Sequence, residues 1–95
     1  MEYRKFGDTY IVRMDPGEEI LTQLKVLAEQ EGVKLASITG LGAVKDFTVG
    51  VFDPGAKVYQ SNRFQGVYEI VSLVGRFNTM DDAFYCHVHM CAADQ

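Results

Sequence analysis

The chain has 95 residues, of which 47% are hydrophobic, and its formal net charge is −4. This length predicts one domain, and the hydrophobic content excludes an intrinsically disordered chain. The negative charge disfavours direct nucleic-acid binding, because the phosphate backbone is bound by clustered basic side chains, and the longest cluster here is Arg4-Lys5.

The apolar segments are all far shorter than a membrane span, and the first seven residues lack the apolar core of a signal peptide. We therefore expect a cytoplasmic protein without a membrane partner. In that compartment Cys86 and Cys91 are expected to be reduced thiols.

The N-terminal residues predict a β-hairpin. Residues 3–14 are rich in β-branched and aromatic side chains, which favour strands. Gly7-Asp8 lies between the two halves of this segment and is typical of a tight hairpin turn.

The next segment predicts a helix. Asp15 is expected to cap it, with Pro16 at the first helical position and Glu18 at the capping-box position. Gly32 is expected to end the helix. Between them, an apolar stripe recurs at helical spacing: Ile20, Leu21, Leu24, Leu27 and Ala28.

Beyond this helix the pattern predicts strands, which short connections would pair in antiparallel fashion. The expected strands are 34–39, 45–52, 57–59, 68–74 and 85–92. Turn-forming residues are expected to separate them: Gly40, Gly42, Asp53-Pro54-Gly55, Asn62, Gly66 and Asn78. The predicted fold class is therefore α+β, a mostly antiparallel β-sheet with one amphipathic helix packed on it.

The last predicted strand contains both histidines of the chain, His87 and His89. Alternate residues of a strand share a face, so both imidazoles are expected to point the same way. Such a pair can bind a metal, and zinc is expected because it accepts three protein ligands plus water. The alternative is a pair of buried or interface histidines without a metal. Cys91 shares their face but lies too far from His87 for the same ion, and is expected to be a small core thiol.

Glu69 is a weak candidate for a catalytic group. It falls in the middle of a predicted strand, where a carboxylate is costly to bury unless it is paired. Beside a metal it could polarise a bound water or orient a histidine. The alternative, which we favour, is an ion pair with Arg63 or Arg76, or a contact between subunits.

Four segments in consistent order resemble the PPC domain family, named for its presence in plants and prokaryotes. They are Pro16-Gly17-Glu18, the S-x-T-G-x-G-x-V run of residues 37–44, the G-x-Y-E-I-x-S-L run of residues 66–73, and His87-Val88-His89-Met90. The resemblance implies a large antiparallel sheet, a homotrimer and, in several prokaryotic members, a metal bound by a histidine pair like this one.

Family members usually continue beyond the histidine strand with a G-G-H-L turn, which supplies another histidine, and further strands. This sequence ends at Gln95. We therefore expect residues 1–95 to form a single PPC-like domain that lacks the C-terminal strands of the family.

Two functions are compatible with these observations. The first, which we favour, is a homotrimeric assembly or regulatory module, with or without a histidine-bound metal and with other protein partners. Plant relatives place this domain beside an AT-hook, and no such Arg-Gly-Arg-Pro motif occurs here, so a DNA role would need a partner. The second is a small zinc-dependent hydrolase or lyase with its site at a subunit junction and Glu69 near the metal.

Overall fold

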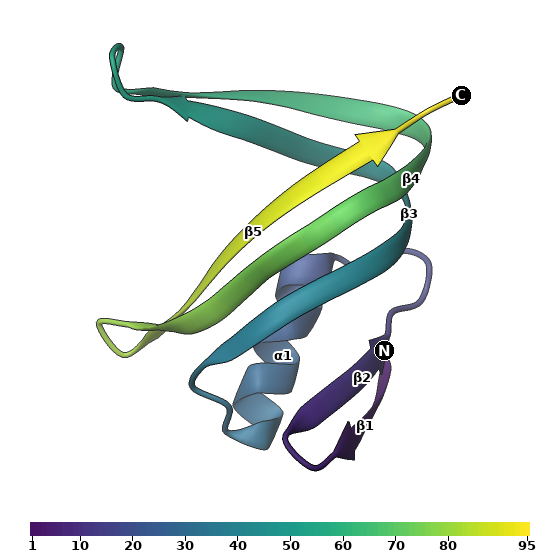
Figure 1. The fold of residues 1–95 in the computed structure, drawn as a ribbon, viewed down its shortest axis with the longest axis vertical. Helices are drawn as coiled ribbons and strands as arrows, with labels where there is room; N and C mark the ends of the chain where they lie inside the picture. Colours follow the sequence, from purple (N-terminus) through teal and green to yellow (C-terminus); the bar gives the residue numbers. More distant parts are fainter. The chain divides into compact units, whose positions relative to one another are not determined.

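The computed structural model describes all 95 residues (Figure 1). The elements are β1 (Glu2–Phe6), β2 (Thr9–Arg13), α1 (Ile20–Glu31), β3 (Ala36–Asp53), β4 (Val58–Met80) and β5 (Ala83–Ala93). β1 and β2 form one sheet, and β3, β4 and β5 form a second sheet in that order. The predicted α+β class, with mostly antiparallel strands and a single helix, is confirmed. No helix has both the length and the apolar character needed to cross a membrane.

Contacts along the chain group into two compact units. The first comprises residues 1–36 and 77–86, which contain β1, β2, α1 and the connection between β4 and β5. The second comprises residues 37–76 and 87–95, which contain most of β3 and β4 and the C-terminal half of β5.

The predicted N-terminal hairpin is confirmed. β1 and β2 pair in antiparallel register from Glu2 opposite Arg13 to Phe6 opposite Thr9. Gly7 in the turn has a φ of 64°, a left-handed conformation that glycine adopts without the usual steric cost.

Two tyrosines connect this hairpin to the end of α1. The hydroxyls of Tyr3 and Tyr10 each donate a hydrogen bond of 3.1 Å to a different oxygen of the Glu31 carboxylate. Their rings pack edge to face with centroids 6.1 Å apart. Desolvation is the largest cause that raises the pKa of both phenols, and the hydrogen bond to Glu31 is the second largest.

The predicted start of α1 was wrong by four residues. Asp15 and Glu18 do exchange bonds, since the Asp15 N–H donates to Glu18 Oε1 (2.6 Å) and the Glu18 N–H donates to the Asp15 carbonyl (3.1 Å). However, Gly17 between them has a φ of 92°, which is incompatible with a right-handed helix. The segment is therefore a separate turn, and the carboxylate of Glu19 caps the helix by accepting from the Thr22 N–H.

The predicted end of α1 is confirmed, because Gly32 adopts a φ of 66° and its N–H bonds to the Ala28 carbonyl. Within the apolar stripe Leu24, Leu27 and Ala28 are buried, whereas Leu21 is 44% exposed.

The long strands depart from the sequence prediction. Segments expected to be separate are continuous in β3 and β4, which run through the glycines and asparagines that were expected to break them. Gly42 and Gly66 have φ values of 148° and 150°, which side chains rarely tolerate, so they change the backbone path without ending the strands. Figure 1 shows both strands curving sharply along their length. The turn at Asp53-Pro54-Gly55 forms as predicted, and the Gly55 N–H donates to Asp53 Oδ1 (2.9 Å).

Candidate metal centre

The two histidines lie side by side on one face of β5. Exposure alternates along this strand, with His87 and His89 on the more exposed face and Cys86, Val88 and Met90 on the half-buried face. The Nε2 atoms of the two imidazoles are 3.1 Å apart, and the ring planes differ by 31°. The predicted common orientation of the pair is therefore confirmed.

This separation suits chelation of one ion. Zinc binds imidazole nitrogen at 2.0–2.1 Å with tetrahedral geometry, which places two such nitrogens about 3.3 Å apart. The observed 3.1 Å between the Nε2 atoms is close to that value. Without a metal, the same distance fits a hydrogen bond from the N–H of one ring to the lone pair of the other.

The histidines are the only two ligands that the chain gathers here, because no cluster of three or more histidine, cysteine or acidic side chains occurs. Cys91 shares the face of the histidines but is exposed, so its prediction as a core thiol was wrong. Cys86 faces the other way, and burial is the main cause that raises the pKa of its thiol. A metal at this pair therefore needs its remaining ligands from outside residues 1–95.

The histidine pair borders an open depression of about 530 Å³ that extends over three strands of one sheet. The lining residues are Ser37, Val74, Gly75, Arg76, His87 and His89. Ser37 lies on β3, residues 74–76 lie on β4, and both histidines lie on β5.

Gly75 allows β5 to approach β4 closely at this depression. A Cβ at this position would collide with the carbonyl oxygen of His87 and would lie 2.7 Å from Val88 Cα, closer than real Cβ atoms come. Because glycine has no side chain, the backbone of β5 at His87 can lie this close to β4.

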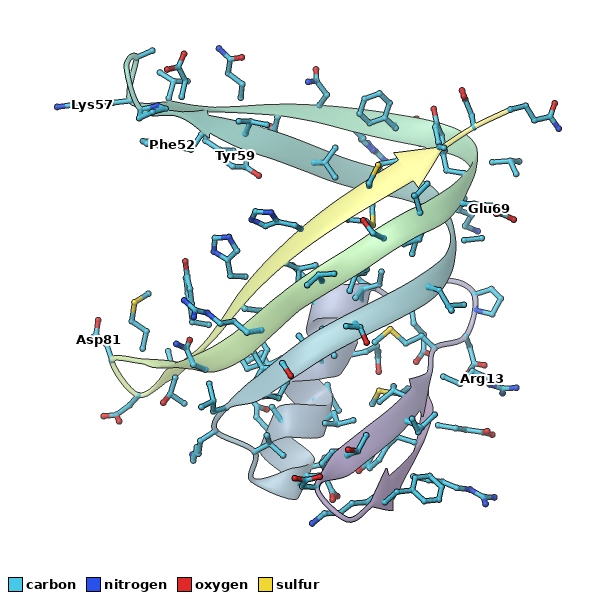
Figure 2. All side chains as sticks on the ribbon, viewed as in Figure 1. Arg13, Phe52, Lys57, Tyr59, Glu69 and Asp81 are labelled. Carbon is cyan, nitrogen blue, oxygen red and sulfur yellow. The ribbon has the colours of Figure 1, made fainter.

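Glu69 does not take part in this site. It is exposed, forms no ion pair or side-chain hydrogen bond, and does not line the depression (labelled in Figure 2). The predicted ion pair with Arg63 or Arg76 was wrong, whereas the other predicted role of Glu69, a contact between subunits, stays a prediction. Arg63 instead forms a two-pronged pair with Asp46, with N–O distances of 2.9 and 2.7 Å. This pairing is the main cause that lowers the pKa of Asp46.

Sequence reasoning missed four contributors to the depression: Ser37, Val74, Gly75 and Arg76. Arg76 was considered only as a partner for Glu69. The residues lie on β3 and β4, and which of them face the histidines depends on the register of three strands, which no local pattern reveals.

A model of the Plants and Prokaryotes Conserved (PCC) domain, the family called PPC above, matches residues 1–95. A plant- and prokaryote-conserved protein from Pyrococcus horikoshii is 32% identical, with a TM-score of 0.87 over 99% of this chain and 65% of that chain. A metal-containing protein from Archaeoglobus fulgidus is 28% identical, with a TM-score of 0.83 over 88% of this chain and 60% of that one.

A third solved structure, from Bacteroides thetaiotaomicron and called a presumed DNA-binding protein, is 32% identical, with a TM-score of 0.90 over 96% of this chain and 64% of that one. The chain thus spans less than two thirds of the length of each of these proteins. The comparison with curated proteins found no match.

Proposed function

Because the chain belongs to the Plants and Prokaryotes Conserved domain family, we propose that it acts as a homotrimeric assembly module whose histidine pair holds a zinc ion. The observation that carries this proposal is the set of large apolar side chains that β3 and β4 leave exposed. The metal rests on a separate observation, the geometry of His87 and His89.

Residues 1–95 bury few side chains. Only five are buried: Leu24, Leu27, Ala28, Leu73 and Phe77. Many large apolar side chains therefore remain at the surface, where association with further subunits could cover them.

Much of the exposed surface is apolar and lies on β3 and β4. Leu41 and Val67 are 92% and 91% exposed, and Phe52 and Tyr59 are exposed near the connection between the two strands (Figure 2). Exposed apolar side chains gathered along two paired strands indicate that these strands associate with another surface. We call the following set the exposed apolar surface: Leu41, Val51, Phe52, Val58, Tyr59, Phe64, Val67, Val71 and Val74.

The distance between the imidazole nitrogens of His87 and His89 is compatible with zinc. The relative from Archaeoglobus fulgidus is described as metal-containing, which supports a metal at this pair without identifying it. Zinc bound here would act as a Lewis acid or as a structural cross-link. The two histidines would hold it, and a neighbouring subunit or water would complete its coordination. Glu69 lies outside the depression, so nothing in the geometry favours the hydrolase or lyase alternative.

A role near DNA, as the name of the Bacteroides relative suggests, would require a partner protein on this proposal. The chain carries 13 acidic and 9 basic residues. Affinity for nucleic acid comes mainly from basic side chains that neutralise phosphates, so an excess of acidic residues weakens it.

The test measures mass and metal in one preparation, purified without chelator or added metal. Size-exclusion chromatography with light scattering should give about three times the chain mass of 10.6 kDa. Elemental analysis should find close to one zinc per chain. A monomeric mass would contradict the assembly module, and metal-free trimers would contradict the zinc site alone.

A further inference from the structure

The depression beside the histidines has a charge unlike that of the rest of the chain. Acidic residues outnumber basic ones by 13 to 9 in the sequence, yet none of the six lining residues is acidic. Arg76 contributes a guanidinium cation, and no carboxylate of the lining opposes it. The lining therefore favours an anion as its ligand.

Arg76 is free to bind one. Arg13 and Arg63 form ion pairs with carboxylates of this chain, whereas Arg76 forms none. It is exposed in β4, and its neighbours in the depression, Val74 and Gly75, offer no competing charge. An unpaired guanidinium presents a planar set of N–H donors that matches the two oxygens of a carboxylate or phosphate.

The surrounding strands provide further polar groups at a suitable spacing. β4 lies between β3 and β5, so Arg76 is flanked by Ser37 on one side and the histidine pair on the other. Strands are spaced about 4.8 Å apart, which makes the depression about 10 Å wide between Ser37 and His87. This width accommodates a small oxyanion.

We propose that this depression binds a small carboxylate or phosphate through the guanidinium of Arg76, beside the histidine pair. The inference deepens the proposed function by naming a ligand beside the metal site, and it rests on that function only for the presence of a metal next to the bound anion. On this proposal Arg76 is a binding residue, and the ligand of the site is an oxyanion.

The test titrates the whole chain with sodium phosphate and with sodium acetate by calorimetry, and zinc content is measured on every sample. Acetamide serves as the neutral analogue of acetate. We expect at least one of the anions to bind and acetamide to give no heat. Phosphate binding without acetate binding, or the reverse, identifies which oxyanion the site selects.

Three variants identify the group responsible. Arg76→Gln should weaken anion binding at least about tenfold, because a hydrogen-bonded charge partner is lost. Arg76→Lys should recover part of the affinity, since it keeps the charge but not the two-pronged geometry. Arg4→Gln is the matched control, because it removes the same charge from β1, where Arg4 forms no ion pair, and should change the affinity by less than about twofold.

Equal losses in Arg76→Gln and Arg4→Gln would overturn the inference, since net charge alone would then explain binding. Unchanged affinity in Arg76→Gln, or no anion binding to the wild-type chain, would overturn it as well. If zinc is absent and Arg76 still governs anion binding, the oxyanion site stands and the metal proposal fails. If zinc is present and Arg76→Gln binds normally, the metal stands and the oxyanion site fails.

Discussion

The 3.1 Å between the Nε2 atoms of His87 and His89 is the feature on which the proposed zinc site depends. Replacing His89 with alanine leaves a single imidazole, which cannot chelate. We expect His89→Ala to lose zinc to background level in elemental analysis and to unfold at a lower temperature than the zinc-containing wild type. Equal metal content in both proteins would contradict the site.

Cys91→Ala is the matched control for that experiment. Cys91 shares the strand face of the histidines but is exposed and belongs to no ligand cluster. Zinc content should therefore stay unchanged in Cys91→Ala. Loss of zinc in this variant would mean that Cys91 supplies a ligand.

Gly75 provides a second prediction for a single residue. A Cβ there would overlap the backbone of β5 at His87 and Val88, and backbone cannot yield as a flexible side chain can. We expect Gly75→Ala to reduce the free energy of unfolding by about 1–3 kcal/mol, as overpacking commonly does. Chemical denaturation measures this change.

Gly40→Ala is the comparison for Gly75→Ala. A Cβ at Gly40 would lie 3.4 Å from a terminal carbon of the Leu73 side chain, which can shift. The Gly40 variant should be clearly more stable than the Gly75 variant. The reverse order would show that β5 does not depend on the missing side chain of Gly75.

Among the elements, the turn before α1 depends on charge. The Met1 ammonium donates to Glu18 Oε2 (2.8 Å) and to Asp15 Oδ2 (3.1 Å). The bond to Glu18 is the largest cause that raises the pKa of this amine, and the same bond most strongly lowers the pKa of the Glu18 carboxyl.

Both shifts make stability depend on pH in this region. An amine with a raised pKa in the folded state stabilises fully below its ordinary pKa of 8.0 and loses this effect as the pH rises through the raised value. A carboxyl with a lowered pKa stabilises above its ordinary pKa of 4.5 and loses this effect as the pH falls through the lowered value. We therefore expect the melting temperature of Glu18→Gln to depend less on pH than that of the wild type, both at acidic and at alkaline pH. Thermal unfolding measured across pH tests this. Identical pH profiles would contradict the role of this contact.

The hairpin and the helix are joined through Glu31, which accepts from both Tyr3 and Tyr10. Glu31→Gln replaces one of the two acceptor oxygens by a donor, so we expect a lower melting temperature by circular dichroism. Glu29→Gln is the matched control, since Glu29 is exposed on the same helix and accepts no side-chain hydrogen bond. Equal melting temperatures of the two variants would contradict the link.

For the whole molecule, the proposed assembly predicts that the exposed apolar surface governs the state of association. Val71 belongs to it and is 65% exposed. An aspartate there would place a charge in the proposed interface, where burial without a partner is costly. We expect Val71→Asp to give a monomer or an aggregate in size exclusion with light scattering.

Thr79→Asp adds the same charge at an exposed position of β4 outside the exposed apolar surface. It should keep the oligomeric mass of the wild type. An unchanged trimer in Val71→Asp would exclude this part of the surface from the interface.

Features that depend on neighbours in the sequence were predictable from it. The hairpin turn at Gly7, the helix end at Gly32 and the common face of the two histidines all follow from local geometry and were confirmed. The resemblance carried by four short segments also identified the family correctly. In the turn, the helix end and the histidine pair, the interacting groups lie within a few residues of one another, so the amino-acid order alone constrains them.

Features that depend on pairing between distant segments were decided only by the tertiary structure. β3 and β4 continue through glycines that locally resemble breaks, because pairing along both strands compensates for their weak strand preference. Arg63 meets Asp46 rather than Glu69, and Arg76 lies beside the histidines, because the register of β3, β4 and β5 places them there. A shift of one residue in that register would turn each side chain to the opposite face, and no local pattern specifies it.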